Sequence, residues 1–130
     1  MRRYHRLSIL AAACIALLVV PGHAQESPSY TAYEVMKGCR ASVERNKYQD
    51  DITSYWRGFC AGTVHALTGT AAALESKIEG STRVCPPRKW IVGQAIRVVA
   101  AYIDARPYRL QESFQLLAME ALREAWPCQR

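Results

Sequence analysis

Four cysteines are the residues of this 130-residue chain whose type and number point most directly to chemistry. Cys39, Cys60, Cys85 and Cys128 follow an N-terminal segment that carries the fifth, Cys14. An even number of cysteines in a short exported chain is typical of a disulfide framework. A zinc or redox site is disfavoured because no two cysteines have the C-x-x-C spacing. We therefore expect two disulfides, and neither a metal nor a cofactor.

The other reactive side chains do not form a catalytic pattern. His65 is the only histidine beyond the N-terminal segment, and a five-residue step rotates it about 140° away from Cys60 around a helix. Asp50 and Asp51 are adjacent, so their side chains diverge instead of flanking a substrate. No nucleotide-binding or zinc-hydrolase motif is present. The sequence therefore predicts no enzyme activity.

Two helices must position Cys39 and Cys60. Thr31 and Glu34 have the spacing of a capping box, which predicts a helix that places Cys39 on its buried face. A second helix begins at Asp50, and the short turn before it makes the two helices antiparallel neighbours. The predicted apolar face of the second helix contains Ile52, Tyr55, Trp56, Phe59, Cys60, Thr63 and Leu67. We predict that Cys39 pairs with Cys60.

A second pair of helices positions the remaining two cysteines. Pro86 and Pro87 can start a third helix that ends before Pro107. Its predicted apolar face contains Trp90, Ile91, Ala95, Val98, Val99, Tyr102 and Ile103, and that of a fourth helix from about Tyr108 contains Leu110, Phe114, Leu117, Ala118, Ala121 and Ala125. An antiparallel arrangement brings Cys85 and Cys128 to the same end, so we predict that they pair. The predicted fold is an all-α, four-helix domain of two antiparallel helical hairpins, stapled by two disulfides.

Small residues recur at about four-residue spacing along the second helix, at Gly58, Gly62, Ala66 and Gly69. Each glycine lowers helix propensity by up to ~1 kcal/mol relative to alanine, so another segment is expected to approach this face closely. The favoured interpretation is tight packing by a neighbouring helix of the same domain. The alternative is the interface of a homodimer.

Residues 1–24 have the pattern of a secretory signal peptide. Three arginines precede an apolar stretch over 7–20, and small residues lead to a predicted cut after Ala24. We expect residues 25–130 to form one periplasmic domain with no stable membrane span. Loss of the three arginines lowers the net charge from +6 to +3, and no basic run remains, so nucleic-acid binding is not expected.

The order of these features resembles the Tai/Rap family of immunity proteins, which protect bacteria against peptidoglycan amidases delivered by type VI secretion. The resemblance rests on Cys39 in the first helix, Gly58-Phe59-Cys60-Ala61-Gly62 in the second, Cys85-Pro86 opening the third with Gln94 inside it, Arg106-Pro107 between helices, and Ala121-Leu122 followed by Ala125-Trp126-Pro127-Cys128. It implies a periplasmic α-helical protein, often a homodimer, that binds a cognate effector amidase and blocks its active-site cleft without being an enzyme.

The resemblance does not identify the residues that contact the partner. The polar linker over 75–83 joins the two hairpins, carries both charge signs and is fixed shortly afterwards by Cys85. Its candidate partner-binding residues are Glu75, Ser76, Lys77, Glu79, Ser81 and Arg83. An ordinary solvated connection explains this linker equally well. A second candidate, the turn over 47–51 with Tyr48, is better explained as a turn and a helix start.

Two other functions fit an exported helical scaffold less well. A periplasmic acid-stress chaperone should partly unfold at low pH and expose apolar surface, whereas two disulfides in a domain of about 100 residues resist opening. A secreted enzyme with an unrecognised site is disfavoured by the single histidine and the absence of paired acids.

Overall fold

The structure, a computed structural model, describes residues 29–44, 50–74, 77 and 83–128. Its four α-helices are α2 (Ala32–Val43), α3 (Asp51–Ala73), α4 (Val92–Asp104) and α5 (Phe114–Ala125), and a 3₁₀ turn, η1 (Pro107–Arg109), separates the last two. The described residues form no strand beyond one isolated bridge, between Thr31 and Ser113. The all-α, four-helix prediction is therefore confirmed. The predicted signal peptide lies outside the described residues.

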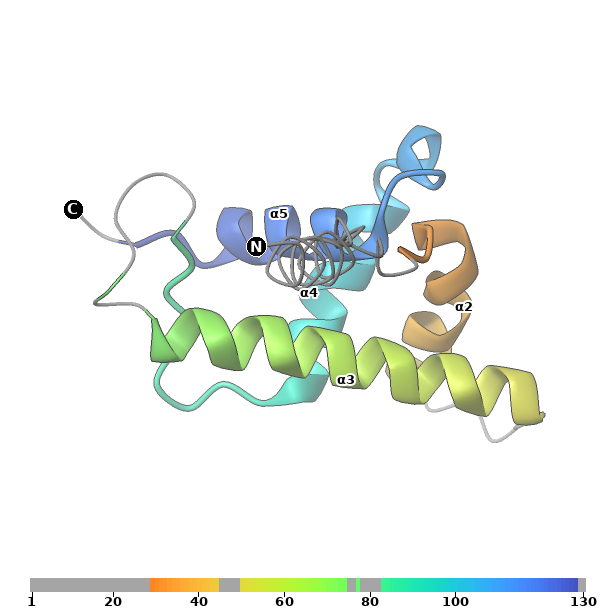
Figure 1. The fold of residues 1–130 in the computed structure, drawn as a ribbon, viewed down its shortest axis with the longest axis horizontal. Coiled ribbons are helices and arrows are strands. Elements are labelled where there is room, and N and C mark those ends of the chain that lie inside the picture. Colours follow the sequence, from red (N-terminus) through yellow and green to blue (C-terminus); the bar gives the residue numbers. More distant parts are fainter. Residues whose placement is uncertain (1–28, 45–49, 75–76, 78–82, 129–130) are drawn as a thin grey trace, which may run out of the picture.

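All four helices share one hydrophobic core. Figure 1 shows α3 and α5 running lengthwise, with α2 and α4 crossing them, and every pair of helices is in contact. The two helices of each predicted hairpin thus meet at a crossing instead of lying side by side along their lengths. The largest fully buried side chains come from all four helices: Phe114, Met36, Ile103, Leu117, Leu122, Val35, Val64, Val99, Thr68, Cys39 and Cys60.

The predicted capping box is present at the start of α2. The Thr31 hydroxyl accepts a hydrogen bond from the backbone N–H of Glu34 at 3.4 Å, and the Glu34 carboxylate accepts one from the Thr31 backbone N–H at 2.8 Å. Helix α3 is capped in a similar way, because the Asp50 carboxylate accepts a hydrogen bond from the Thr53 backbone N–H at 2.6 Å. Both caps satisfy backbone donors that a helix leaves unpaired at its first turn.

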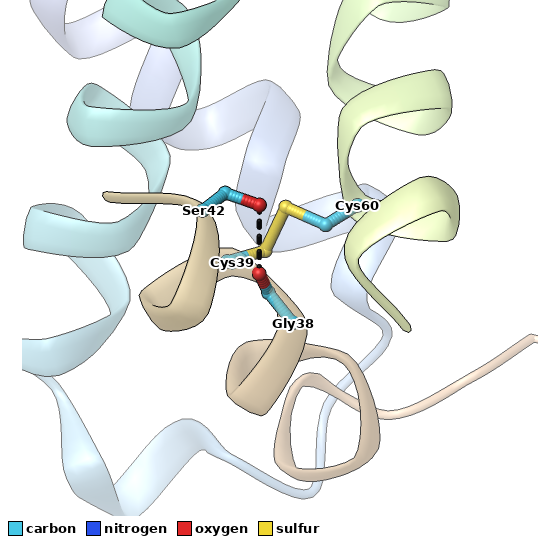
Figure 2. Close-up of a disulfide and its surroundings, with 4 residues drawn as sticks. All are labelled: Gly38, Cys39, Ser42 and Cys60. Carbon is cyan, nitrogen blue, oxygen red and sulfur yellow. Dashed lines mark hydrogen bonds between the residues drawn. A yellow bond between two sulfur atoms is a disulfide. The ribbon is translucent and has the colours of Figure 1, made fainter. Parts of the chain in front are cut away.

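The Cys39–Cys60 disulfide joins α2 to α3 at their closest approach, with the two Cα atoms 5.5 Å apart. Figure 2 shows Gly38 beside this bridge, with its carbonyl accepting a hydrogen bond from the Ser42 hydroxyl at 2.9 Å. A Cβ atom at Gly38 would overlap the backbone carbonyl of Trp56 and lie 2.5 Å from the backbone nitrogen of Arg57. Only a glycine therefore lets the two helices come this close.

The Cys85–Cys128 disulfide ties the segment before α4 to the end of α5, with Cα atoms 5.0 Å apart. The Cys85 backbone N–H also donates a hydrogen bond to the Trp126 carbonyl, at 2.9 Å. Both predicted disulfide pairings are confirmed.

The third helix begins later than predicted, at Val92 instead of near Pro86. Trp90 ends a single turn in which its N–H donates to the Pro87 carbonyl at 3.0 Å, and Ile91 is the N-cap without a side-chain hydrogen bond. Two prolines set a helix-compatible backbone but cannot supply the capping oxygen that begins a longer helix. The segment from Cys85 to Ile91 is therefore a connection.

The fourth helix also begins later than predicted, at Phe114 instead of Tyr108. The intervening backbone pairs with the start of α2: Ala32 and Tyr33 donate N–H groups to the carbonyls of Glu112 and Leu110, at 2.9 and 2.8 Å. These donors have no partner inside their own helix. Their satisfaction by residues 110–112 keeps that stretch out of α5.

Four residues assigned to apolar faces are exposed instead of buried, and one of them, Ala125, is the last residue of α5. Ile52 and Tyr55 lie on the first turns of α3, which extend beyond the other helices, and Ile91 lies at the N-cap of α4. The helical periodicity of α3 is correct, but its buried line follows Cys60, Val64 and Thr68. The apolar pattern of a long helix does not show how much of its length has neighbours.

Candidate partner-binding surface

Most of the predicted linker site lies outside the described residues. This applies to Glu75, Ser76, Glu79 and Ser81. Lys77 is exposed, and its backbone N–H donates to the Leu74 carbonyl at 2.8 Å, which closes a turn after α3. Arg83 is half-buried. The 47–51 turn is described only at Asp50 and Asp51, which cap and begin α3. The linker therefore stays a prediction.

The described surface contains a groove between α2, the first part of α3 and the loop before α5. We call it the α2 groove; its volume is about 410 Å³, and its lining residues are Tyr33, Glu34, Met36, Lys37, Arg40, Trp56 and Leu110. Met36 is fully buried, whereas Tyr33 on the rim exposes 68% of its surface. The groove thus has an apolar interior and an accessible aromatic edge, and its volume is within the usual range of ligand pockets.

Aromatic contacts hold the Trp56 side of the α2 groove in place. The Trp56 ring meets those of Tyr30 and Tyr55 edge to face, with centroids 5.1 and 5.0 Å away. Phe59 completes the cluster, 4.9 Å from Tyr30. Edge-to-face pairs of aromatic rings stabilise a protein by more than the burial of their apolar surface alone. The Trp56 ring is therefore already held in position in the free protein.

The charged side chains of the α2 groove differ in whether they already have partners. Arg40 forms an ion pair with Asp104, with Nη2 2.6 Å from the carboxylate. Glu34 is held by Thr31, and hydrogen bonds from the Thr31 backbone and hydroxyl lower the pKa of its carboxyl group. Lys37 lies 5.5 Å from the centre of the Trp56 ring and forms no ion pair within the described residues.

A second feature is the turn between α4 and α5, which stands out from the body of the protein in Figure 1. It carries Tyr108, which exposes 82% of its surface. The turn is held by Arg109, whose guanidinium forms ion pairs with Glu112 at 2.7 Å and with Glu120 of α5 at 2.5 Å. These charge-assisted bonds hold the turn that carries the exposed Tyr108 against α5.

The same ion pairs change the titration of the carboxyl groups. Hydrogen bonds from Arg109 lower the pKa of both Glu112 and Glu120. The Tyr102 hydroxyl also donates to Glu120, at 2.9 Å, and burial raises the pKa of this phenol. The turn is therefore attached to α4 and α5 by a network that requires ionised carboxylates.

The small-residue face of α3 is not covered by any of the other helices that the structure describes. A Cβ atom at Gly58, Gly62 or Gly69 would meet no described atom outside α3 within 4 Å, and Ala66 is exposed. The favoured interpretation of close packing by a neighbouring helix is therefore wrong. The backbones of α2 and α3 approach each other closely at Gly38 instead. Gly38 does not belong to the row of small residues from which a close approach was predicted.

Among the described residues, Cys60 and His65 do not form a catalytic arrangement. Cys60 is in a disulfide, and the exposed His65 packs against Trp90, with ring centroids 5.5 Å apart. The described residues contain no group of three or more side chains suited to hold a metal ion. No helix within the described ranges has both the length and the apolar character needed to cross a bilayer.

The α2 groove was not predicted from the sequence. One signal was available, because Tyr33, Lys37 and Arg40 follow helical spacing on the face of α2 opposite its apolar line. A tyrosine on an otherwise polar face is a candidate contact residue. The contributions of Trp56 and Leu110 could not have been found, since they come from other segments of the chain.

The fold and these surfaces define a small all-α scaffold held by two disulfides. A family model for Rap1a immunity proteins matches residues 23–128, which include both disulfides. The chain therefore belongs to the Rap1a immunity protein family, which implies an immunity protein of type VI secretion and a non-enzymatic inhibitor. No curated protein and no solved structure matched the chain.

Proposed function

We propose that this protein is a periplasmic immunity protein that binds a peptidoglycan amidase delivered by type VI secretion and blocks its active-site cleft. The observation that carries the proposal is the family match over 23–128. The geometry fits an inhibitor that acts by shape. Two disulfides and the Arg109 ion pairs hold the helices and the projecting turn in place, so little conformational entropy is lost when a partner binds.

The direct test uses the effector encoded beside the immunity gene. Purified effector should digest peptidoglycan, and an equimolar amount of the disulfide-bonded protein should abolish digestion and form a complex with a nanomolar dissociation constant. Tyr108→Ala, which removes an exposed side chain without disturbing the core, should weaken inhibition if the projecting turn enters the cleft. An effector that is neither bound nor inhibited by the wild-type protein would refute the proposed function.

We also propose that the protein is exported and that residues 1–24 are removed, leaving 25–130 as the functional domain. Export supports the function because a toxin that cleaves peptidoglycan is met outside the cytoplasm. The mass of the protein recovered from the periplasm tests this directly. It should correspond to a chain that starts at Gln25 and carries two disulfides, whereas an uncleaved mass or free thiols would contradict the proposal.

The uncovered face of α3 supports a homodimer. Gly58, Gly62 and Ala66 are exposed, and small residues allow two helix backbones to approach closely. Sedimentation of the wild-type protein should then show a dimer, and Ala66→Arg should shift it to monomer without lowering the melting temperature. Sedimentation of both proteins as monomers at high concentration would exclude this interface.

A further inference from the structure

The strongest unassigned feature is the α2 groove, lined by Tyr33, Glu34, Met36, Lys37, Arg40, Trp56 and Leu110. It lies on α2 and the first part of α3, away from the face of α3 that carries Gly58 and Gly62. Its apolar interior and its rim contain tyrosine, tryptophan and arginine, which are the residues most enriched where binding energy concentrates in protein interfaces. An exposed tyrosine beside a hollow of this size is a suitable anchor for a partner.

The α2 groove is already organised in the free protein. Arg40 is held by Asp104, Glu34 by Thr31, and Trp56 by the aromatic rings around it. The backbone N–H of Tyr33 donates to the Leu110 carbonyl at 2.8 Å, which ties the loop wall to α2. A partner would therefore bind without having to order these side chains.

One charge in the α2 groove is left for a partner. Of the three charged lining residues, Arg40 and Glu34 are engaged within the protein, whereas Lys37 lies 5.5 Å from the centre of the Trp56 ring and forms no ion pair with another described residue. The Asp50 carboxylate already accepts hydrogen bonds from the Thr53 backbone N–H and hydroxyl, which lower its pKa more than the through-space effect of Lys37 does. The ammonium group of Lys37 thus keeps N–H donors that a carboxylate can fill, next to an apolar hollow.

We propose that the α2 groove binds a segment of the cognate effector that presents an apolar side chain next to a carboxylate. The apolar side chain occupies the hollow between Met36, Trp56 and Leu110, and the carboxylate pairs with Lys37. Tyr33 covers the apolar side chain from the rim. This inference rests on the proposed function and adds to it a contact surface of defined chemistry, separate from the projecting turn.

The test compares full-length, disulfide-bonded variants in binding to the effector encoded beside the gene. Lys37→Glu should weaken the complex about tenfold or more, mainly through faster dissociation, because it places two negative charges together. Tyr33→Ala should weaken it several-fold. Lys37→Met keeps the apolar stem and should remove part of the salt dependence of binding. Lys89→Glu, the same charge change at an exposed position in the segment before α4, is the matched control and should leave affinity unchanged.

The outcomes separate the two proposals. If the wild-type protein binds the effector and Lys37→Glu and Tyr33→Ala bind equally well, the groove assignment is overturned and the proposed function stands. If the wild-type protein does not bind, both are overturned. If the variants reduce self-association but not affinity for the effector, the groove joins two copies of this chain and the assignment is wrong. Equal melting temperatures of all variants would show that a loss of binding is not a loss of folding.

Discussion

Replacing Gly38 with alanine tests the claim that α2 and α3 meet backbone to backbone. The added methyl group would overlap the carbonyl carbon and oxygen of Trp56 and lie 2.5 Å from the backbone nitrogen of Arg57. None of these atoms can rotate away as a side chain can. The adjacent Cys39–Cys60 disulfide holds the two helices together, so they cannot separate freely to make room.

The magnitude follows from two opposing effects. Overpacking a well-packed site costs about 1–3 kcal/mol, and the upper end applies because the obstructing atoms belong to the backbone. Alanine is better than glycine in a helix by about 1 kcal/mol. The net expectation for Gly38→Ala is a loss of about 2 kcal/mol in the free energy of unfolding, which corresponds to a fall of roughly 8–16 °C in Tm for a domain of this size.

Urea and thermal unfolding followed by circular dichroism measure this change, with the disulfides verified by mass. Gly93→Ala in α4 is the matched control, since the added methyl group would lie 3.9 Å from the end of the flexible Arg97 side chain, an ordinary van der Waals distance. It should raise stability by roughly 0.5–1 kcal/mol, because only the helix propensity changes. The two substitutions therefore have opposite predicted signs. A Gly38→Ala protein as stable as the wild type, with its disulfides intact, would refute the close approach of the two backbones.

Three further predictions concern the Cys85–Cys128 disulfide, the N-cap of α2 and the ion pairs of Arg109. Replacing Cys85 and Cys128 with serine opens a link across 43 residues and should lower stability by about 4 kcal/mol in the chain-entropy model, measured by urea unfolding; an unchanged midpoint would contradict the role of this disulfide. Thr31→Ala removes the capping oxygen of α2 and should cost about 1 kcal/mol, seen as a lower midpoint in the same assay, and no change would show that the cap is dispensable. Because Arg109 lowers the pKa of Glu120 below its ordinary value of 4.5, the stability from this pair is fully present above that value and is lost as the pH falls through the folded-state pKa. Arg109→Met should therefore lower Tm at pH 7 and reduce the fall in Tm between pH 5 and pH 3; an acid profile parallel to that of the wild type would contradict this.

Much of the fold was accessible from residue spacing. The capping box at Thr31 and Glu34 located the start of α2, and helical periodicity placed Cys39 and Cys60 on facing sides. Both features depend on residues a few positions apart, where the geometry of the helix is fixed. The Cys39–Cys60 pairing followed from the short turn expected between two neighbouring helices, and the Cys85–Cys128 pairing from the end that the second pair of helices was expected to share.

The candidate site was less accessible, because its parts come from separate segments. The α2 groove forms because the Tyr33 backbone N–H donates a hydrogen bond to the Leu110 carbonyl. The opposite wall forms because the Trp56 ring packs against the rings of Tyr30 and Tyr55. The linker chosen from its polarity could not be distinguished from an ordinary connection by composition. A polar segment is expected to be exposed to solvent, but polarity does not show whether it contacts a partner. A binding groove also needs a hollow shape, which forms only when separate segments of the chain pack together.

The sequence by itself determined the helical character of the chain, its two disulfides and its family resemblance, because these are encoded in local periodicity and in the order of residues. Only the tertiary structure decided where α4 and α5 begin, which face of α3 stays uncovered, and that Gly38 is the point of closest approach. Each of these depends on contacts between residues far apart in the chain. The backbone of residues 110–112 is held out of α5 by donors at the start of α2, a requirement that no pattern within either segment reveals.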